Sequence, residues 1–264
     1  MDAREIMTSS SAVRVEIAEA VTKLTLDRPQ SHNAITDDLL EGLHCAIDAA
    51  EADAECRVVM LCGAAGIFCT GMDLNEPGPG RGDHSFAGAA EPFFDLLVRF
   101  TTSTLTVVAV VDGRAAGGGV GLVAASDFVL ATPRSQFSLP EALWGLLPCC
   151  VLPFLMRRIG FQRAYSMALS TVPVAAARAA EIGLVDEIGE SLEIPLRRLL
   201  ARVTKLRPAT VAALKRYVAE FGPIHATTRQ RAVDEFETLA ASPDFREALG
   251  RYTRERRYPW EAHR

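Results

Sequence analysis

Apolar and polar residues alternate over two short stretches near the start of the chain, residues 13–17 and 21–26. Such alternation predicts half-buried strands, because successive side chains of a strand point to opposite faces of a sheet. Pro29 follows the second stretch and ends it, since proline has no N–H to donate to a neighbouring strand. Residues 1–11 are mostly polar, and we expect this part of the chain to be loose.

Helix and strand patterns then follow one another along the chain. Thr36 is a suitable N-cap for a helix whose apolar positions, spaced three and four residues apart, extend to Ala50. Apolar runs of strand length predict buried strands at residues 58–61, 105–111 and 128–130. Helical spacing recurs at residues 91–100, 152–159, 162–169, 174–182, 194–203, 209–221 and 227–241.

This order of elements predicts an α/β fold. Strands that alternate with helices form crossover units, which build a mainly parallel sheet. The pattern in the last third of the chain is mainly helical. We therefore expect an α/β core in residues 1–200 and a helical C-terminal region in residues 201–264.

Composition and charge exclude several classes of protein. A net charge of −5 argues against a nucleic-acid-binding protein, because such proteins normally carry a basic surplus. The basic run of Arg251, Arg254, Arg256 and Arg257 indicates a solvated face, a contact between copies or a partner site. The six cysteines lack the spacing of a zinc site, and no apolar run is long enough to span a membrane. We therefore expect reduced thiols, no metal, no membrane contact and a cytoplasmic protein.

Two glycine-bearing loops are candidates for an anion-binding site. Gly71 stands in a loop after an apolar strand, where glycine can adopt backbone angles that aim the next N–H into a cavity. Gly117, Gly118 and Gly119 follow another strand and open a helix, whose first N–H groups have no partner within the helix. The glycines lack the Lys-Ser/Thr pair of a phosphate loop and the spacing of a dinucleotide site. The remaining interpretations are an oxyanion hole, or a plain turn and close packing.

Glu141 is the third candidate for chemistry. It is the only carboxylate in the otherwise apolar stretch 137–146. One interpretation is a helix-start residue or an ion-pair partner. The other is a desolvated carboxylate whose raised pKa suits proton transfer near neutral pH.

Together, these segments resemble the crotonase, or enoyl-CoA hydratase/isomerase, superfamily. The resemblance covers nearly the whole chain, through Arg28-Pro29, Asn33-Ala34, Gly71-Met72-Asp73, the glycine run and Pro140-Glu141. It implies a spiral of β-β-α units, with C-terminal helices that assemble trimers or hexamers. It also implies an acyl-thioester substrate, no cofactor, and an oxyanion hole formed by the N–H groups of Met72 and Gly118, with Gly71 and Gly117 beside the substrate.

One position departs from the pattern of the family's hydratases. Those enzymes use a second glutamate three positions after the middle glycine of the run, and this chain has Gly121 there. A glycine has no side chain with which to hold a water molecule. The departure argues against a standard straight-chain enoyl-CoA hydratase, whereas the enolate-forming part of the site, with Glu141, is retained.

A closer resemblance narrows the substrate. Residues 137–160 and the ending Tyr258-Pro259-Trp260-Glu261 resemble the crotonase-like dehydratases of polyketide β-branching cassettes. This implies dehydration of a 3-hydroxy-3-methylglutaryl group on acyl carrier protein to the 3-methylglutaconyl group. Glu141 would remove the α-proton while the two N–H donors hold the enolate.

The leaving hydroxide needs a proton. Glu141 can return the one it took, or Asp73 or His84 can supply one, although both of the latter could equally be structural. For the free carboxylate of the substrate, Arg81 and Arg114 are the candidate cations, from chain position only.

The resemblance also places the carrier's pantetheine arm along the loop from Arg28 to Ala34. Trp144 is either a wall of the acyl pocket or an ordinary core residue.

Other reactions remain compatible with the sequence. A Δ3,Δ2-enoyl-CoA isomerase needs a single glutamate, and a decarboxylase needs the oxyanion hole above all. Coenzyme A is an alternative carrier to acyl carrier protein. A catalytically silent scaffold or RNA-binding member of the superfamily is disfavoured by the retained Glu141 and by the acidic net charge.

Overall fold

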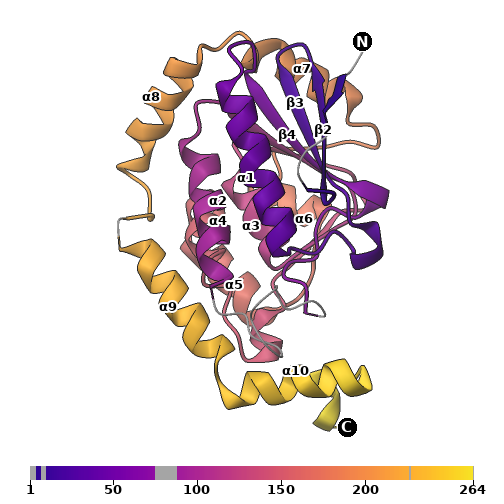
Figure 1. Cartoon of the computed structure of the whole chain (residues 1–264). Helices are drawn as coiled ribbons and strands as arrows, with labels where there is room; N and C mark the ends of the chain where they lie inside the picture. Colours follow the sequence, from indigo (N-terminus) through magenta and orange to yellow (C-terminus); the bar gives the residue numbers. More distant parts are fainter. Residues whose placement is uncertain (1–3, 7–9, 75–87, 226, 264) are drawn as a thin grey trace.

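The computed structural model describes residues 4–6, 10–74, 88–225 and 227–263 (Figure 1). The strands are β1 (Arg4–Ile6), β2 (Val13–Ala18), β3 (Val21–Leu26), β4 (Val58–Gly63), β5 (Thr106–Val111), β6 (Arg114–Ala116), β7 (Phe128–Ala131), β8 (Gln136–Ser138), β9 (Val174–Ala175) and β10 (Glu187–Ile188). The α-helices are α1 (Asp37–Ala52), α2 (Ala90–Thr102), α3 (Gly118–Ala125), α4 (Leu152–Ile159), α5 (Phe161–Ser170), α6 (Ala176–Glu181), α7 (Glu193–Val203), α8 (Pro208–Ala219), α9 (Thr228–Ala240) and α10 (Pro243–Glu255). Short 3-10 turns are η1 (Pro29–Ser31), η2 (Ala64–Gly66), η3 (Glu141–Trp144) and η4 (Pro259–His263).

The strands form two sheets. The main sheet has the order β1-β2-β3-β4-β5-β7-β10, with antiparallel pairing from β1 to β3 and parallel pairing from β3 onward. The second sheet has the order β6-β8-β9, in which β6 and β8 are parallel and β9 is antiparallel to β8.

The chain repeats one order of elements: a strand of the main sheet, then a shorter extended segment, then a helix. β5 is followed by β6 and α3, and β7 is followed by β8 and η3. After β3 and β4 the extended segments are single bridges, Ile35 to Met72 and Cys69 to Ala115. This repeat confirms the expected spiral of β-β-α units. It stacks the extended segments side by side, so residues distant in the sequence meet around one cavity.

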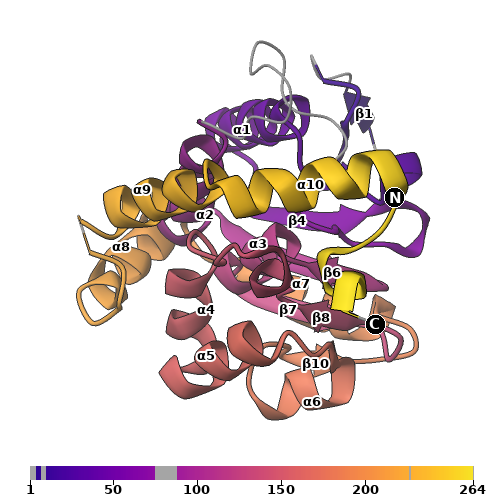
Figure 2. The ribbon, with the colours of Figure 1, turned by 90° about the horizontal axis from the view of Figure 1, so that it is seen from below.

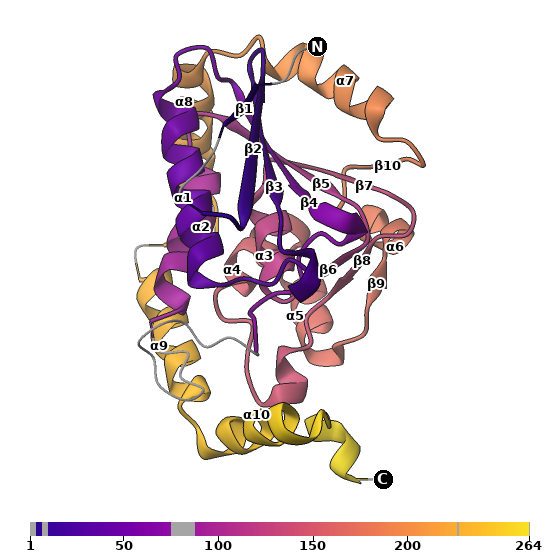
Figure 3. The ribbon, with the colours of Figure 1, turned by 45° about the vertical axis from the view of Figure 1, so that its right-hand side comes forward.

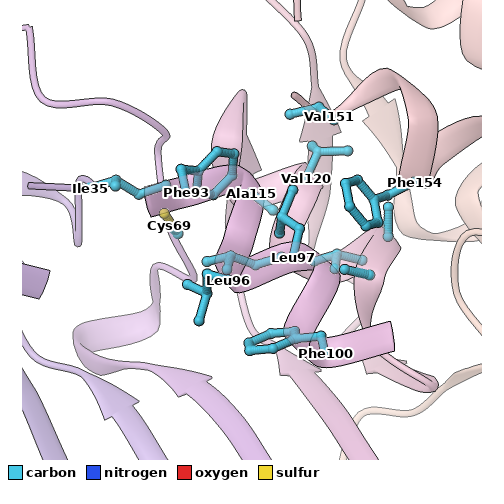
Figure 4. Packing of buried hydrophobic residues seen from close by; sticks show 14 of the residues in the cluster. Ile35, Cys69, Phe93, Leu96, Leu97, Phe100, Ala115, Val120, Val151 and Phe154 are labelled. Carbon is cyan, nitrogen blue, oxygen red and sulfur yellow. The ribbon is translucent and has the colours of Figure 1, made fainter. Parts of the chain in front are cut away.

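Helices cover both faces of the main sheet. α2 buries Phe94, Leu96, Leu97 and Phe100 in the core, and Figure 4 shows Leu96, Leu97 and Phe100 among other buried apolar side chains. α3 is buried along its whole length after Gly118. On the opposite face, leucines of α7 pack against a smaller cluster formed by β4, β5 and β7. Figure 3 shows α7 on the far side of the strands from α1 and α2.

The C-terminal helices are attached to the core by charged side chains. Lys215 of α8 donates to the carbonyl oxygens of Phe100 and Leu105 at 2.8 and 2.9 Å and pairs with Asp127 at 2.7 Å. Arg229 of α9 pairs with carboxylates of α2. Figure 1 shows α8 and α9 along one side of the core and α10 crossing its lower end. The expected boundary at residue 200 falls inside α7.

Two sequence-based expectations are wrong. The N-terminal part is not entirely loose, because β1 pairs with β2 along the edge of the main sheet. The stretch 174–182 is not one helix. It begins with β9, whose Val174 pairs with Phe137, and only then forms α6, since pairing with an open sheet edge satisfies backbone groups that helical spacing alone does not reveal.

Within the described ranges, no helix is both long and apolar enough to cross a membrane. The same residues contain no group of three potential His, Cys, Asp or Glu metal ligands. All six cysteines lie in the described part of the chain, and each is a free thiol.

Candidate active site

A cavity of about 150 Å³ lies where the extended segments of successive turns meet. Its walls come from residues 35–37 and 70–74, the start of α2, Gly117 and Gly118, residues 140–151 and Phe236 of α9. Apolar side chains form most of this lining. Asp37, Asp73 and Glu141 are the charged residues among the described lining residues.

The N–H of Met72 is left without an acceptor by the way its loop is paired. Ile35 donates to the carbonyl of Gly71 at 2.7 Å and accepts from the N–H of Asp73 at 3.0 Å. In a parallel bridge, Ile35 forms its hydrogen bonds with the two neighbours of the residue opposite it, so that opposite residue forms no backbone hydrogen bond with Ile35. Met72 is that residue, and no acceptor for its N–H is found among the described residues. Gly71 makes the turn possible, with φ of +83°.

The N–H of Gly118 is similarly available at the start of α3. Gly117 has φ of +52° and donates to the carbonyl of Ser138 at 2.9 Å, which fixes the entry of the helix against β8. Gly118 is the first helical residue, so its N–H has no intrahelical partner, and no other described residue accepts it. A Cβ atom on Gly71 would stand 3.2 Å from this nitrogen. The two glycine loops are therefore in contact.

Glu141 projects its carboxyl group towards these loops from η3. The Oε1 atom lies 3.2 Å from the position of a Cβ atom on Gly117. The Oε2 atom is buried and has no hydrogen-bond partner in the described structure. Burial raises the pKa of Glu141 to about 7, because the charged form loses its hydration. A carboxyl group with this pKa can accept and return a proton near neutral pH.

The position of the missing second glutamate is filled by apolar atoms. A Cβ atom on Gly121 would meet Phe93 Cζ at 3.0 Å, Val151 Cγ2 at 3.1 Å and Leu97 Cδ1 at 3.3 Å. Figure 4 shows Phe93, Leu97 and Val151 around α3. These side chains crowd the space beside Gly121, and the chain has no second carboxylate at this point.

Two other candidates, Asp73 and Arg28, are bound to each other. Arg28 Nη1 lies 3.3 Å from Asp73 Oδ2 and donates to the carbonyl of Ala34 at 2.9 Å. Asp73 lines the cavity, whereas Arg28 and Ala34 stand behind its lining, next to Ile35. The loop of residues 28–34 is thus held against the cavity by its own arginine.

Trp144 lies in the cavity wall and is only 8% exposed. Arg114 is exposed at the start of β6 and carries a charge close enough to Tyr258 to lower the pKa of that phenol, although other groups raise it overall. His84 and Arg81 fall outside the described residues.

Three residues of the cavity could not be identified from the sequence. Phe93 and Phe236 are apolar residues on helices, and in the sequence they look like any other residue of a buried helix face. Phe236 also belongs to α9, which is far from the glycine loops along the chain. Cys149 also lines the cavity, and the pKa of its thiol is raised to about 11 by burial and by the charges of Glu235 and Glu141. The unusual pair of adjacent cysteines at 149 and 150 was the one feature of the sequence that could have drawn attention to Cys149. Only the fold shows that it faces the cavity.

Comparison with known proteins is consistent with this geometry. The Enoyl-CoA hydratase/isomerase family model matches residues 16–263. The Bacillaene synthase dehydratase PksH of Bacillus subtilis is 32% identical over 251 residues, covering 94% of this chain and 96% of PksH. A PksH crystal structure from the same species has a TM-score of 0.88 at 30% identity, covering 95% of this chain and 100% of that one. For an enoyl-CoA hydratase from Mycobacterium avium, the TM-score is 0.80 at 29% identity, with coverage of 95% and 99%.

The spiral fold, with two free N–H groups facing a buried carboxyl group, defines a crotonase-type enzyme. The chain belongs to the enoyl-CoA hydratase/isomerase family, a family of hydro-lyases.

Proposed function

We propose that this enzyme removes water from a 3-hydroxy-3-methylglutaryl thioester on acyl carrier protein, giving the 3-methylglutaconyl thioester during polyketide β-branching. The similarity to the dehydratase PksH supports a polyketide dehydratase or an enoyl-CoA hydratase-like role. The finer assignment of the acyl group and its carrier is our proposal.

One observation carries the chemical part of the proposal. Glu141 has a buried, unpartnered carboxyl oxygen beside the glycine loops, whereas apolar side chains close the position of a second glutamate at Gly121. A site with one carboxyl group suits a reaction in which the same group first removes a proton and then returns it. Hydration of a straight-chain enoyl thioester, for which the family's hydratases use two glutamates, fits less well.

The proposed reaction begins with the thioester carbonyl between the N–H groups of Met72 and Gly118. The carboxylate of Glu141 takes the α-proton, and the C–H electron pair moves onto the carbonyl oxygen, where the two N–H groups stabilise the enolate. The enolate then re-forms the carbonyl and the C–C double bond, and the bond from the β-carbon to oxygen breaks. The leaving hydroxide takes the proton from Glu141, so water is released and the carboxylate is regenerated.

Asp73 is a weaker candidate for the proton donor, because its carboxylate is already paired with Arg28. We assign that pair to holding the loop of residues 28–34, beside which the pantetheine arm of the carrier would lie. His84 and Arg81 remain candidates for the leaving group and the substrate carboxylate, and Arg114 is the described alternative to Arg81.

Mass spectrometry of 3-hydroxy-3-methylglutaryl-carrier protein incubated with the enzyme tests this proposal. We expect the acyl group to lose the mass of one water, and Glu141→Gln to abolish the loss while keeping the size of the side chain. The same acyl group on coenzyme A, tested in parallel, distinguishes the two carriers. An unchanged mass with both carriers would overturn the proposal.

A Δ3,Δ2-enoyl-CoA isomerase is the second candidate, since it also needs a single carboxyl group and is equally compatible with the closed position at Gly121. Turnover of a 3-enoyl-CoA, combined with no loss of water from the hydroxy substrate, would favour the isomerase.

We further propose that the enzyme is a homotrimer or a pair of trimers. Large apolar side chains are exposed on two helices, and exposed groups of this kind are commonly covered in oligomers. On α5 they are Phe161, Tyr165 and Leu169, and on α8 they are Leu214 and Tyr217, with Phe221 two residues after that helix. Light scattering after size-exclusion chromatography measures the mass of the assembly, and a monomer would contradict this part of the proposal.

A further inference from the structure

The C-terminal segment of the chain packs aromatic rings against the wall of the cavity. Trp144 contacts Tyr252 of α10 edge to face, with ring centroids 5.3 Å apart. It also contacts Tyr258 and Trp260, at 6.1 and 5.9 Å. Tyr258 and Trp260 stack on each other at 4.7 Å. The indole of Trp144 is therefore held between the cavity on one side and three rings from the end of the described chain on the other.

Trp144 shares a single turn with Glu141. Both belong to η3, and the turn is closed by the N–H of Gly145, which contacts the carbonyls of Ala142 and Glu141. Leu146 also donates to the carbonyl of Glu141, at 3.1 Å. These hydrogen bonds tie the two ends of the turn together, so a displacement of the indole would be passed to the backbone that carries the carboxyl group.

Figures 1 and 2 show how the segment reaches this position. α10 crosses the lower end of the molecule in Figure 1, and in the view from below of Figure 2 the chain turns back after α10 into η4. Tyr258 and Trp260 remain 39% and 41% exposed while both contact Trp144, so each residue lies partly in water and partly against the indole. These two rings thus separate the cavity wall from solvent.

We propose that Tyr258 and Trp260 are positioning residues, which clamp Trp144 and thereby fix the carboxyl group of Glu141 and keep water away from it. The clamp rests on the proposed role of Glu141 as the base. Neither ring lines the cavity, so they act through Trp144 and not on the substrate. Removing a ring should loosen the wall and admit water beside the carboxyl group.

Kinetics of ring variants test the clamp. Trp260→Ala and Tyr258→Ala should each lower kcat by about tenfold, because small errors in the placement of a catalytic group are costly. The conservative variant Trp260→Phe should restore most of kcat. Arg257→Ala is the matched control, since Arg257 is exposed in the same segment.

The pH profile separates positioning from a general loss of stability. Desolvation holds the pKa of Glu141 near 7, so hydration of the loosened site should move the midpoint of the kcat profile to lower pH in Trp260→Ala. The other described titratable groups facing the cavity are Asp37, Asp73, Cys149 and Cys150, with Glu235 near Cys149. All of them are present in every variant. An unchanged kcat and midpoint in both ring truncations would overturn the clamp.

Fluorescence gives a readout that does not depend on turnover. The chain has two tryptophans, so Trp260→Phe and Trp260→Ala both leave Trp144 as the only one. Acrylamide should quench Trp144 more strongly in Trp260→Ala than in Trp260→Phe, and equal quenching would count against the clamp. If the wild-type enzyme dehydrates no acyl thioester, the proposed function fails, while the quenching comparison still decides whether the clamp exists.

Discussion

The Oε1 atom of Glu141 lies 3.2 Å from the point that a Cβ atom on Gly117 would occupy. The Cα atom of Gly71 lies 3.7 Å from the same point. The carboxyl group and the two glycine loops therefore meet in a space that only a hydrogen at position 117 leaves open. In the proposed reaction, this contact would let proton removal and enolate stabilisation occur on neighbouring atoms of one substrate.

The contact between the glycine loops gives the first prediction. A Cβ atom on Gly71 would stand 2.9 Å from the carbonyl oxygen of Ala116 and 3.2 Å from the nitrogen of Gly118. Gly71→Ala should therefore obstruct the oxyanion hole and lower kcat by about 100-fold or more, the effect of losing one donor. Gly183→Ala is the matched control, because Gly183 has the same φ of +83° with nothing within 4 Å. Equal losses of kcat in the two variants would attribute the effect to backbone strain.

Burial of Glu141 should make stability depend on pH. Its folded pKa of about 7 lies above the ordinary value of 4.5, so the native state holds a proton that the unfolded state loses. The burial of the charged carboxylate therefore lowers the free energy of unfolding by an amount that grows from about pH 4.5 to 7 and stays constant above that range. Glu141→Gln should stabilise the protein by up to roughly 3 kcal/mol at pH 8 and by little at pH 4. Denaturant titration at both pH values measures this difference, and a benefit independent of pH would contradict it.

Restoring the missing glutamate should fail. Gly121→Glu would drive a side chain into Phe93, Val151 and Leu97 and would bury a charge among them. Overpacking alone typically costs about 1–3 kcal/mol, so the melting temperature should fall and no hydration of crotonyl-CoA should appear. Gly121→Ala isolates the steric part of the cost. A stable Gly121→Glu enzyme with hydratase activity would show that the packing around α3 is not the obstacle.

The buried lysine of α8 should matter for stability and not for chemistry. Lys215→Met removes the donor to two carbonyls and leaves the half-buried Asp127 without this partner, and breaking a buried pair typically costs about 3–5 kcal/mol. Arg197→Ala, which breaks an exposed pair with Glu193, should cost less than about 1 kcal/mol. Chemical denaturation compares the two variants. A similar small loss in both would mean that α8 is not held by Lys215.

The sequence pointed to those residues of the candidate site that can be recognised from their immediate neighbours along the chain. Gly71, Gly117 and Gly118 stand out because tight turns and bare helix starts require glycine, and Glu141 stands out as a lone charge among apolar residues. The alternation of strands and helices in an α/β core was also predictable from periodicity, whereas the spiral of β-β-α units was expected only from the family resemblance. Strands of two or three residues, such as β6 and β9, were not, because so short a segment has no measurable period.

The remaining features depend on contacts between distant residues. Nothing near Asp73 indicates that Arg28, 45 positions earlier, occupies its carboxylate. The crowding around Gly121 likewise requires Phe93 of α2 and Val151, the residue before α4, to meet at the same point. The absence of a glutamate can be read from the sequence, whereas the filling of its position can only be seen in the fold.

Every residue of α3 after Gly118 is buried, and the helix meets packed side chains on all sides. A helix in this position cannot slide or rotate to admit a bulkier acyl group, because the interior is packed as densely as a crystal. Changes of substrate preference, in evolution or in the laboratory, are therefore expected to accumulate in the surrounding wall, at positions such as Leu147, Cys149 and Phe236.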